Sequence, residues 1–211
     1  MKRSPIRISL LYILLFIVPL FGQNSDADQS DLDRGYLMVS GGVGSTSFSI
    51  ADFEKVYVNR PLDKVAIAAV GARSAAIVAK FREVRASGQS IVKNVQSAGA
   101  SQWYQRYWEA GFRFRSDRLP FYMDILYFLT TAREDIGMAT DPITALTDSH
   151  TEKQRGVAAA LGIAIPLIPP VRLFGEAEYG MVIKKESQDG TASTAPELGG
   201  FRLAGGVQIA F

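Results

Sequence analysis

Few side chains in this sequence are suited to covalent or metal chemistry. The chain of 211 residues contains no cysteine and a single histidine. This excludes thiolate metal sites, a cysteine nucleophile, a disulfide framework and a centre built from several histidines. The histidine, His150, directly follows Asp148 and Ser149. Three neighbours in one segment do not give the geometry that a catalytic triad requires, so we predict no catalytic residue and no enzyme.

Three further patterns resemble functional motifs without completing them. The segment 42–46 (Gly-Val-Gly-Ser-Thr) lacks the lysine of a phosphate loop. Glu176 and Glu178 share one strand face, as a glycosidase pair could, but arginines are expected beside them. The acidic run 26–33 does not continue with the glycine and distant glutamate of a calcium loop. We therefore predict no metal and no cofactor.

The N-terminal segment has the features of a secretory signal peptide. Residues 1–22 contain a basic start, an apolar run from Ile8 to Phe21 and then the small residue Gly22. The alternative is a transmembrane anchor, but this run has 14 residues and includes Pro19, whereas about 20 are needed to span hydrocarbon as a helix. Residues 23–34 are polar and are predicted to form a disordered tether.

Removing the leader changes the charge balance. The whole chain has 23 basic and 21 acidic residues, and three of the basic ones lie in residues 1–22. The mature chain then has 20 bases and 21 acids, a net charge of −1. Nucleic-acid binding, which needs a basic stripe, has no support in this composition. At 47% hydrophobic residues the chain is also too apolar for a disordered protein.

From Gly35 onward the apolar residues alternate along the chain, which is typical of strands with two different faces. In 199–211 and 171–184 the odd-numbered positions are apolar, while the even-numbered ones are small, polar or charged. In 103–115 the even-numbered positions from Tyr104 to Phe114 are apolar, with Arg106 as the exception. A soluble sandwich could show the same alternation. The leader, and tight turns that alternate with long connections, favour a transmembrane barrel instead.

The C-terminal segment resembles the closing strand of bacterial outer-membrane β-barrels. Its outward residues are Phe201, Leu203, Gly205, Val207 and Ile209, and it ends on the terminal aromatic residue Phe211. The resemblance extends to the small eight-stranded members of that group through a glycine-rich first strand and loops that are long on one side. It implies an all-β, antiparallel, up-and-down transmembrane barrel, whose terminal strand is read by the barrel-assembly machinery. It also implies the outer membrane of a diderm bacterium.

Counting strands back from Phe211 predicts six, and an even, closed barrel needs two more. We predict strands near 35–48, 64–72, 75–84, 103–115, 119–130, 156–166, 171–184 and 199–211, with the barrel spanning residues 35–211. The alanine-rich part of 64–84 is also compatible with a helix. The connections 49–63, 85–102, 131–155 and 185–198 are predicted to be long outer loops.

The charged faces of these strands are predicted to point into the barrel. Eight strands leave an interior that side chains can fill, and charges there need partners. We expect Arg202 to meet Glu178 or Glu176, and Arg113 to meet Asp124. The small face of 158–164 should make room for large inward residues such as Tyr122. Trp103, Tyr104 and Trp108 at one end, and Phe112, Phe114 and Phe121 at the other, are predicted to form aromatic girdles. The predicted lumen network comprises Glu109, Arg113, Asp124, Arg172, Glu176, Glu178 and Arg202.

These patterns predict a monomeric barrel with a filled lumen and a structural or surface-interaction role through its outer loops. Its expected partners are outer-membrane lipid, the assembly machinery and an extracellular ligand held by the loops. Two alternatives remain open at this stage: a narrow transport pore and a lipid-modifying enzyme. A secreted soluble barrel is a further alternative, distinguished by whether the protein needs detergent.

Overall fold

The fold consists of β-strands in antiparallel order. The computed structural model describes residues 36–47, 57, 63–72, 74–92, 95–116, 119–138, 146–187 and 197–211. The predicted signal peptide and tether lie outside these residues. Within them, no helix is long and apolar enough to cross a membrane. The strands are β1 (Tyr36–Thr46), β2 (Asp63–Gly71), β3 (Ala75–Val92), β4 (Val95–Arg115), β5 (Phe121–Met138), β6 (Leu146–Ile168), β7 (Val171–Ser187) and β8 (Gly200–Ala210).

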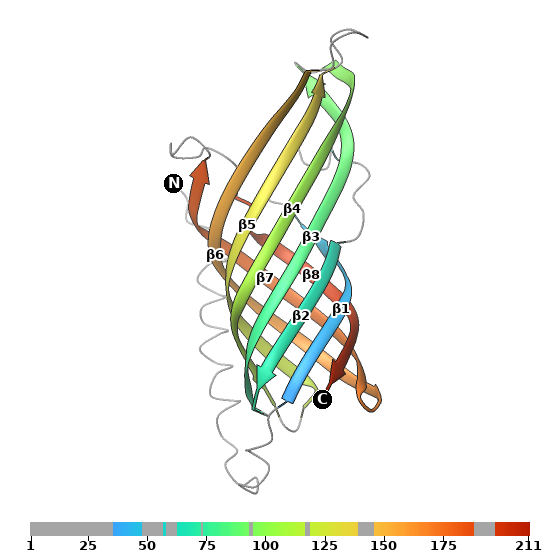
Figure 1. Cartoon of the computed structure of the whole chain (residues 1–211), viewed down its shortest axis with the longest axis vertical. Helices are drawn as coiled ribbons and strands as arrows, with labels where there is room; N and C mark the ends of the chain where they lie inside the picture. Colours follow the sequence, from blue (N-terminus) through green and yellow to red (C-terminus); the bar gives the residue numbers. More distant parts are fainter. Residues whose placement is uncertain are drawn as a thin grey trace, which may run out of the picture.

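The eight strands form one closed barrel in which every strand pairs with its sequence neighbours. β1 and β8 close the barrel, with Gly42 opposite Gly206. Both of these glycines are needed there, because a Cβ on either would lie within 2.3 Å of a backbone oxygen of the partner strand. The start of β1, the end of β8 and the tight turns lie together at one end of the barrel (Figure 1). We call this the turn end and the opposite one the loop end.

The alanine-rich segment 64–84 forms the hairpin of β2 and β3, so the helical alternative is wrong. Small side chains suit this position because β2 presents alternate residues to the inside and the outside. The expectation of eight strands is confirmed. Bulges shift the register at Gln89–Ile91 and at Arg155–Gly156, both toward the loop end.

Two of the predicted long loops are largely strand instead. Residues 85–92 and 95–102 extend β3 and β4, and the described parts of 131–155 extend β5 and β6. A strand of about 9–11 residues spans a membrane, whereas β4 has 21 residues and β6 has 23. β3 to β6 therefore rise beyond the shorter β1, β2 and β8 as a projecting wall at the loop end (Figure 1).

Burial follows the alternation of the strands. The outer surface carries large apolar side chains that would be unfavourable in water, among them Ile77, Trp108 and Phe112, each about 60% exposed. Leu161, Leu173, Phe201 and Leu203 continue this surface around the barrel. Contact of such a belt with hydrocarbon satisfies the apolar side chains, and the closed sheet leaves no unpaired strand edge there. The barrel wall is thus that of a membrane-spanning protein.

Small residues on the inner wall face large ones, as expected for 158–164. A Cβ on Gly162 would lie 2.1 Å from the Cζ atom of Tyr122, and one on Gly156 would lie 2.5 Å from the Phe128 ring. Ala158, Ala160 and Ala164 are also buried. The inner wall of β6 is therefore shaped to accommodate rings from β5.

Candidate functional site: a charged lumen beneath a loop plug

The lumen collects charged side chains because the inward positions of six strands carry them. Every member is at most 4% exposed, so each needs a partner within the barrel. The set contains four cations and five carboxylates, and thus no strongly dominant sign. Its members are Asp63 on β2, Lys80 and Arg82 on β3, Glu109 and Arg113 on β4, Asp124 on β5, Glu176 and Glu178 on β7, and Arg202 on β8.

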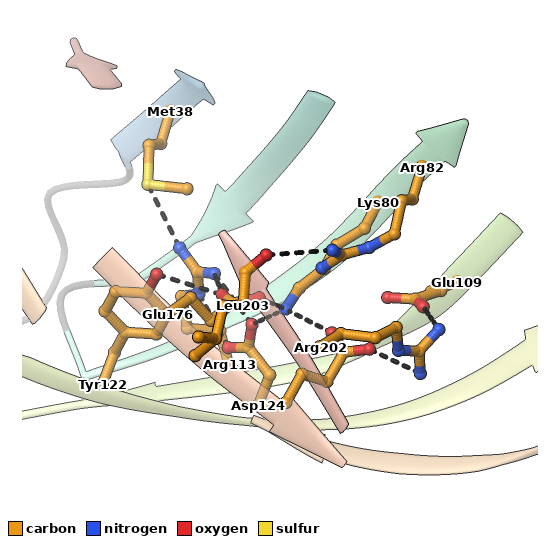
Figure 2. A network of polar contacts seen from close by, with 11 residues as sticks. Met38, Lys80, Arg82, Glu109, Arg113, Tyr122, Asp124, Glu176, Arg202 and Leu203 are labelled. Carbon is orange, nitrogen blue, oxygen red and sulfur yellow. Dashed lines mark hydrogen bonds and ion pairs between the residues drawn. The ribbon is translucent and has the colours of Figure 1, made fainter. Parts of the chain in front are cut away.

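Lys80 lies at the centre of this network (Figure 2). Its ammonium is 2.8 Å from Asp124 and 3.3 Å from Glu178, and it also donates a short hydrogen bond to Glu176. One cation therefore contacts three carboxylates from β5 and β7. The Lys80 side chain crosses the lumen to reach them, and this occupies the space that an ion pathway would need.

Arg113 and Asp124 form the paired contact expected between β4 and β5. The two residues are directly opposite in the register. The guanidinium donates to both carboxylate oxygens at 2.7 and 2.8 Å, a geometry that combines charge with direction. It also lies 3.8 Å from the centre of the Tyr122 ring, whose hydroxyl donates to Glu176 at 3.0 Å.

Arg202 joins β8 to β4 and β7. Its guanidinium lies 2.7 Å from Glu109 and 2.6 Å from Glu178, so the expected contact with Glu178 is present and that with Glu109 is additional. The rings of Tyr107 and Phe128 lie 4.4 and 5.3 Å from the guanidinium carbon. The cation is thus held by two carboxylates and by aromatic faces.

A smaller group lies closer to the loop end. Arg82 contacts Asp63 at 3.5 Å and donates to the backbone oxygen of Leu203 at 3.1 Å. Thr46 donates a short hydrogen bond to the same carboxylate of Asp63. This group ties the loop ends of β1, β2 and β8 to the middle of β3.

Arg172 does not join the paired groups described above. It is half-buried, at the start of β7 and opposite Gln208. No carboxylate contact of Arg172 is found among the described residues, and Arg115 is the neighbouring charge that acts on it. Its inward position was predicted correctly, but it lies at the turn end, beyond the reach of Glu176 and Glu178. Including it in the network was wrong.

Two loop residues, Tyr57 and Leu198, are buried at the loop end, and we call them the plug. Tyr57 and Leu198, from the connections after β1 and β7, pack with Trp103, Ala86 and Ala132 on the inner face of the projecting wall. The Tyr107 hydroxyl donates to the Leu198 oxygen at 2.6 Å, and the Leu198 amide donates to Gln154 at 2.9 Å. Tyr57 donates a short hydrogen bond to Glu134.

The position of Trp103 corrects the predicted aromatic girdle. Trp103 is 8% exposed and lies inside the wall, 6.1 Å from the Tyr57 ring, whereas Trp108 is 61% exposed on the outside. The two differ because successive side chains of a strand point to opposite faces of the sheet. Trp103, Gln105 and Tyr107 occupy alternate positions of β4 that face the inside of the barrel. Tyr104, Phe112 and Phe121 do lie on the outer side.

The plug residues could not be found in the sequence, because no periodic pattern marks Tyr57 or Leu198 within their connections. Lys80 and Arg82 could be found, since they share the inward parity of β3. His150 lies in β6, opposite Glu134, and not in a loop as expected. Among the described residues, no group of acidic or histidine side chains is arranged to hold a metal ion. The arrangement as a whole fills and closes a barrel.

Comparison with known proteins gives matches at the level of structure alone. No family model and no curated protein matches the sequence. The attachment invasion locus protein Ail of Yersinia pestis, in a complex with the heparin analogue sucrose octasulfate, superposes with a TM-score of 0.54 at 11% identity. That match covers 84% of this chain and 97% of Ail.

A major outer-membrane protein of Thermus thermophilus gives a TM-score of 0.51 at 11% identity, covering 84% of this chain and all of that one. At such identities the likeness concerns the fold. The chain has the fold of the small outer-membrane β-barrels, as its closed eight-stranded sheet and apolar belt indicate independently.

Proposed function

We propose that this chain is an outer-membrane barrel that does not conduct ions and acts through the projecting wall and loops at its loop end. The role is structural or one of surface interaction. The observation that supports it most directly is the lumen, where Lys80 on β3 reaches carboxylates on β7 and Arg202 on β8 reaches Glu109 on β4, each from the opposite side of the barrel.

The filled lumen argues against the pore alternative on physical grounds. A wide channel needs a row of polar groups with open space between them, whereas these side chains contact one another at hydrogen-bond distances. The plug of Tyr57 and Leu198 adds a second closure. Single-channel recording of the folded protein in a planar bilayer tests this directly. Baseline current is expected, and steady ion-selective openings would refute a closed lumen.

The projecting wall supports a role in surface interaction. β4 and β6 are longer than spanning a membrane requires, so part of each strand extends beyond the bilayer. Ail, which shares the fold, was crystallised with a heparin analogue. For this chain, too, we propose an extracellular ligand that is bound at the loop end.

A binding experiment with a trimmed wall tests this proposal. Residues 88–101 and 137–147 are each replaced by an Asn-Gly turn, which joins strands that are already in register. Immobilised heparin and purified matrix proteins are the probes, and detergent-folded full-length barrel is compared with the trimmed form. Binding by the full barrel alone supports the proposal. Equal binding by both forms, or by neither, contradicts a role for the wall.

A further inference from the structure

The charges on the outer surface are confined to the loop end. Among the described outward side chains, none is charged in the half of the barrel nearest the turns. Among the described outward side chains above the apolar belt, cations outnumber carboxylates, since six exposed cations accompany Glu83, Asp135 and the exposed Glu197 just before β8. These cations are Lys64, Arg85, Arg106, Arg133, Lys153 and Lys184. We call this band the basic collar.

The collar directly borders the belt, as the strand register shows. Phe81, Trp108 and Leu129 form one apolar row across β3, β4 and β5. The next outward row contains Glu83, Arg106 and Thr131. The row above that contains Arg85, Tyr104 and Arg133. At about 3.3 Å per residue, the first and third rows are about 13 Å apart along the strand, roughly the step from acyl chain to headgroup.

The centre of the collar is organised by its own contacts. The guanidinium carbons of Arg85 and Arg106 lie 5.0 and 4.7 Å from the centre of the Tyr104 ring. Glu83 lies 2.8 Å from Arg85 and 3.5 Å from Arg106, and it accepts a hydrogen bond from Tyr104 at 2.7 Å. Two guanidiniums are thus held over one ring by a single carboxylate.

Arg133 approaches this group from the next strand. It pairs with Asp135 at 2.8 Å, and its side chain remains 56% exposed. An open pocket of about 390 Å³ lies between Arg85 and Arg133, with Tyr104, Gln102 and Ser87 among its lining residues. The pocket therefore offers guanidinium, phenol, amide and hydroxyl groups, together with the Asp135 carboxylate that pairs with Arg133. Arg106 and Glu83 lie beside Tyr104, outside the lining of the pocket.

We propose that this pocket binds the phosphate group of an anionic lipid in the leaflet at the loop end. The inference rests on the membrane placement in the proposed function. Arginine forks match phosphate oxygens, and the lipid's acyl chains would lie on the row of Phe81, Trp108 and Leu129. A soluble polyanion would not need this adjacency to the belt, and so the arrangement favours a lipid.

Fluorescence of Trp108 provides a local measurement. The chain has two tryptophans, of which Trp108 is exposed in the apolar row and Trp103 is buried. The folded barrel is placed in phosphatidylcholine vesicles containing about one-tenth phosphatidic acid with brominated acyl chains. Bromine quenches nearby indole, so quenching reports the lipid beside Trp108. A Trp108→Phe protein gives the background from Trp103.

Two triple variants lose the same charge from the collar. The site variant is Arg85→Gln, Arg106→Gln and Arg133→Gln; the control is Lys64→Gln, Lys153→Gln and Lys184→Gln. We expect wild type and control to enrich phosphatidic acid over brominated phosphatidylcholine. In the site variant the relative association constant should fall by roughly a hundred-fold, which is about five-fold for each of the three cations. Equal losses in both variants, or no loss, would overturn the site.

Two further arms separate the causes of failure. Gel mobility before and after heating shows whether each protein is a folded barrel, so failure of the membrane placement is distinguished from failure of the site. If the triple variant does not fold, Arg133→Gln alone should still lower the association constant by roughly five-fold.

Displacement of the lipid by millimolar inorganic phosphate would show a site for free anions and contradict the proposal; retention of the lipid supports it.

Discussion

At the scale of single residues, the lumen depends on how many partners each charge has. Lys80 has three carboxylates within reach, so the loss of one leaves two. Glu109 is different, because Arg202 is the cation that contacts it directly among the described residues. The network is thus robust around Lys80 and fragile around Glu109.

Replacing Arg202 by Gln should therefore destabilise the barrel strongly. The change leaves the buried Glu109 carboxylate without its direct partner, which typically costs about 3–5 kcal/mol. Unfolding in urea, followed by tryptophan fluorescence in detergent micelles, measures the loss. Adding Glu109→Gln should restore part of the stability, because a neutral amide can be buried at less cost. A double variant as unstable as Arg202→Gln would argue against this pairing.

Two glycines give a matched test of the inner packing. Gly162→Ala should destabilise the barrel by about 1–3 kcal/mol, because the new Cβ would meet the Tyr122 ring, which is held by Glu176 and Arg113. Gly41→Ala places a methyl group where no atom lies within 4 Å and should be nearly neutral. Urea unfolding of both variants is the measurement. Equal effects would show that glycine content, and not this contact, decides stability.

The plug carries a pH dependence that follows from Tyr57. Burial, followed by the hydrogen bond to Glu134, raises the pKa of the Tyr57 hydroxyl well above its ordinary value. A raised folded-state pKa means that the stabilisation is complete below about pH 10 and is lost as the pH rises further.

In folded protein, therefore, tyrosinate absorbance up to about pH 11 should be the same for wild type and Tyr57→Phe. In urea the wild type should show one additional ionising tyrosine. The same difference in the folded state would contradict docking of Tyr57.

Single residues also show where sequence reasoning succeeds. The inward or outward side of Arg113, Asp124 and Glu178 follows from strand parity alone. For Trp103 the aromatic type predicts the outer girdle, whereas its odd position in β4 places it inside. Arg172 had the correct parity, but alternation says nothing about depth along the barrel axis. Tyr57 and Leu198 reach the plug through tertiary contacts, which no local pattern encodes.

At the scale of elements, the strands were predictable where one face contacts hydrocarbon. β7 and β8 alternate clearly and were found close to their observed bounds. Above the belt both faces of β3 to β6 carry polar residues, so the two-residue period disappears although the strand continues. The sequence pattern consequently predicts loops where the structure has the projecting wall. Backbone pairing between neighbouring strands maintains it, together with the apolar cluster around Trp103 on its inner face.

Trimming the wall should therefore leave the barrel stable. With residues 88–101 and 137–147 replaced by short turns, all four strands still exceed the about 9–11 residues that a membrane requires. The charged residues of the lumen, such as Asp63 and Asp124, lie outside both replaced segments and nearer the turn end. We expect urea midpoints close to that of the full barrel. A large loss of stability would mean that the wall, and not the membrane-spanning part, supports the fold.

At the scale of the whole molecule, the distribution of polarity is inverted relative to a soluble protein. The charged residues fill the interior, and the large apolar residues cover the outside. Composition does not reveal this inversion, because the net charge is near zero and the hydrophobic fraction is ordinary. The sidedness follows from the closed sheet and from the residues that alternate along it.

The most direct test of this sidedness uses the absence of cysteine, since a single introduced cysteine can carry a spin label without background. Labels at the outward residues Ala79, Ala110 and Ala159 are compared with one at Ser87, above the belt. In lipid vesicles, the three belt labels should collide with dissolved oxygen and be shielded from a water-soluble nickel reagent, and Ser87 should show the reverse. Nickel accessibility at Ala79, Ala110 and Ala159 would contradict a barrel whose outer wall lies in hydrocarbon.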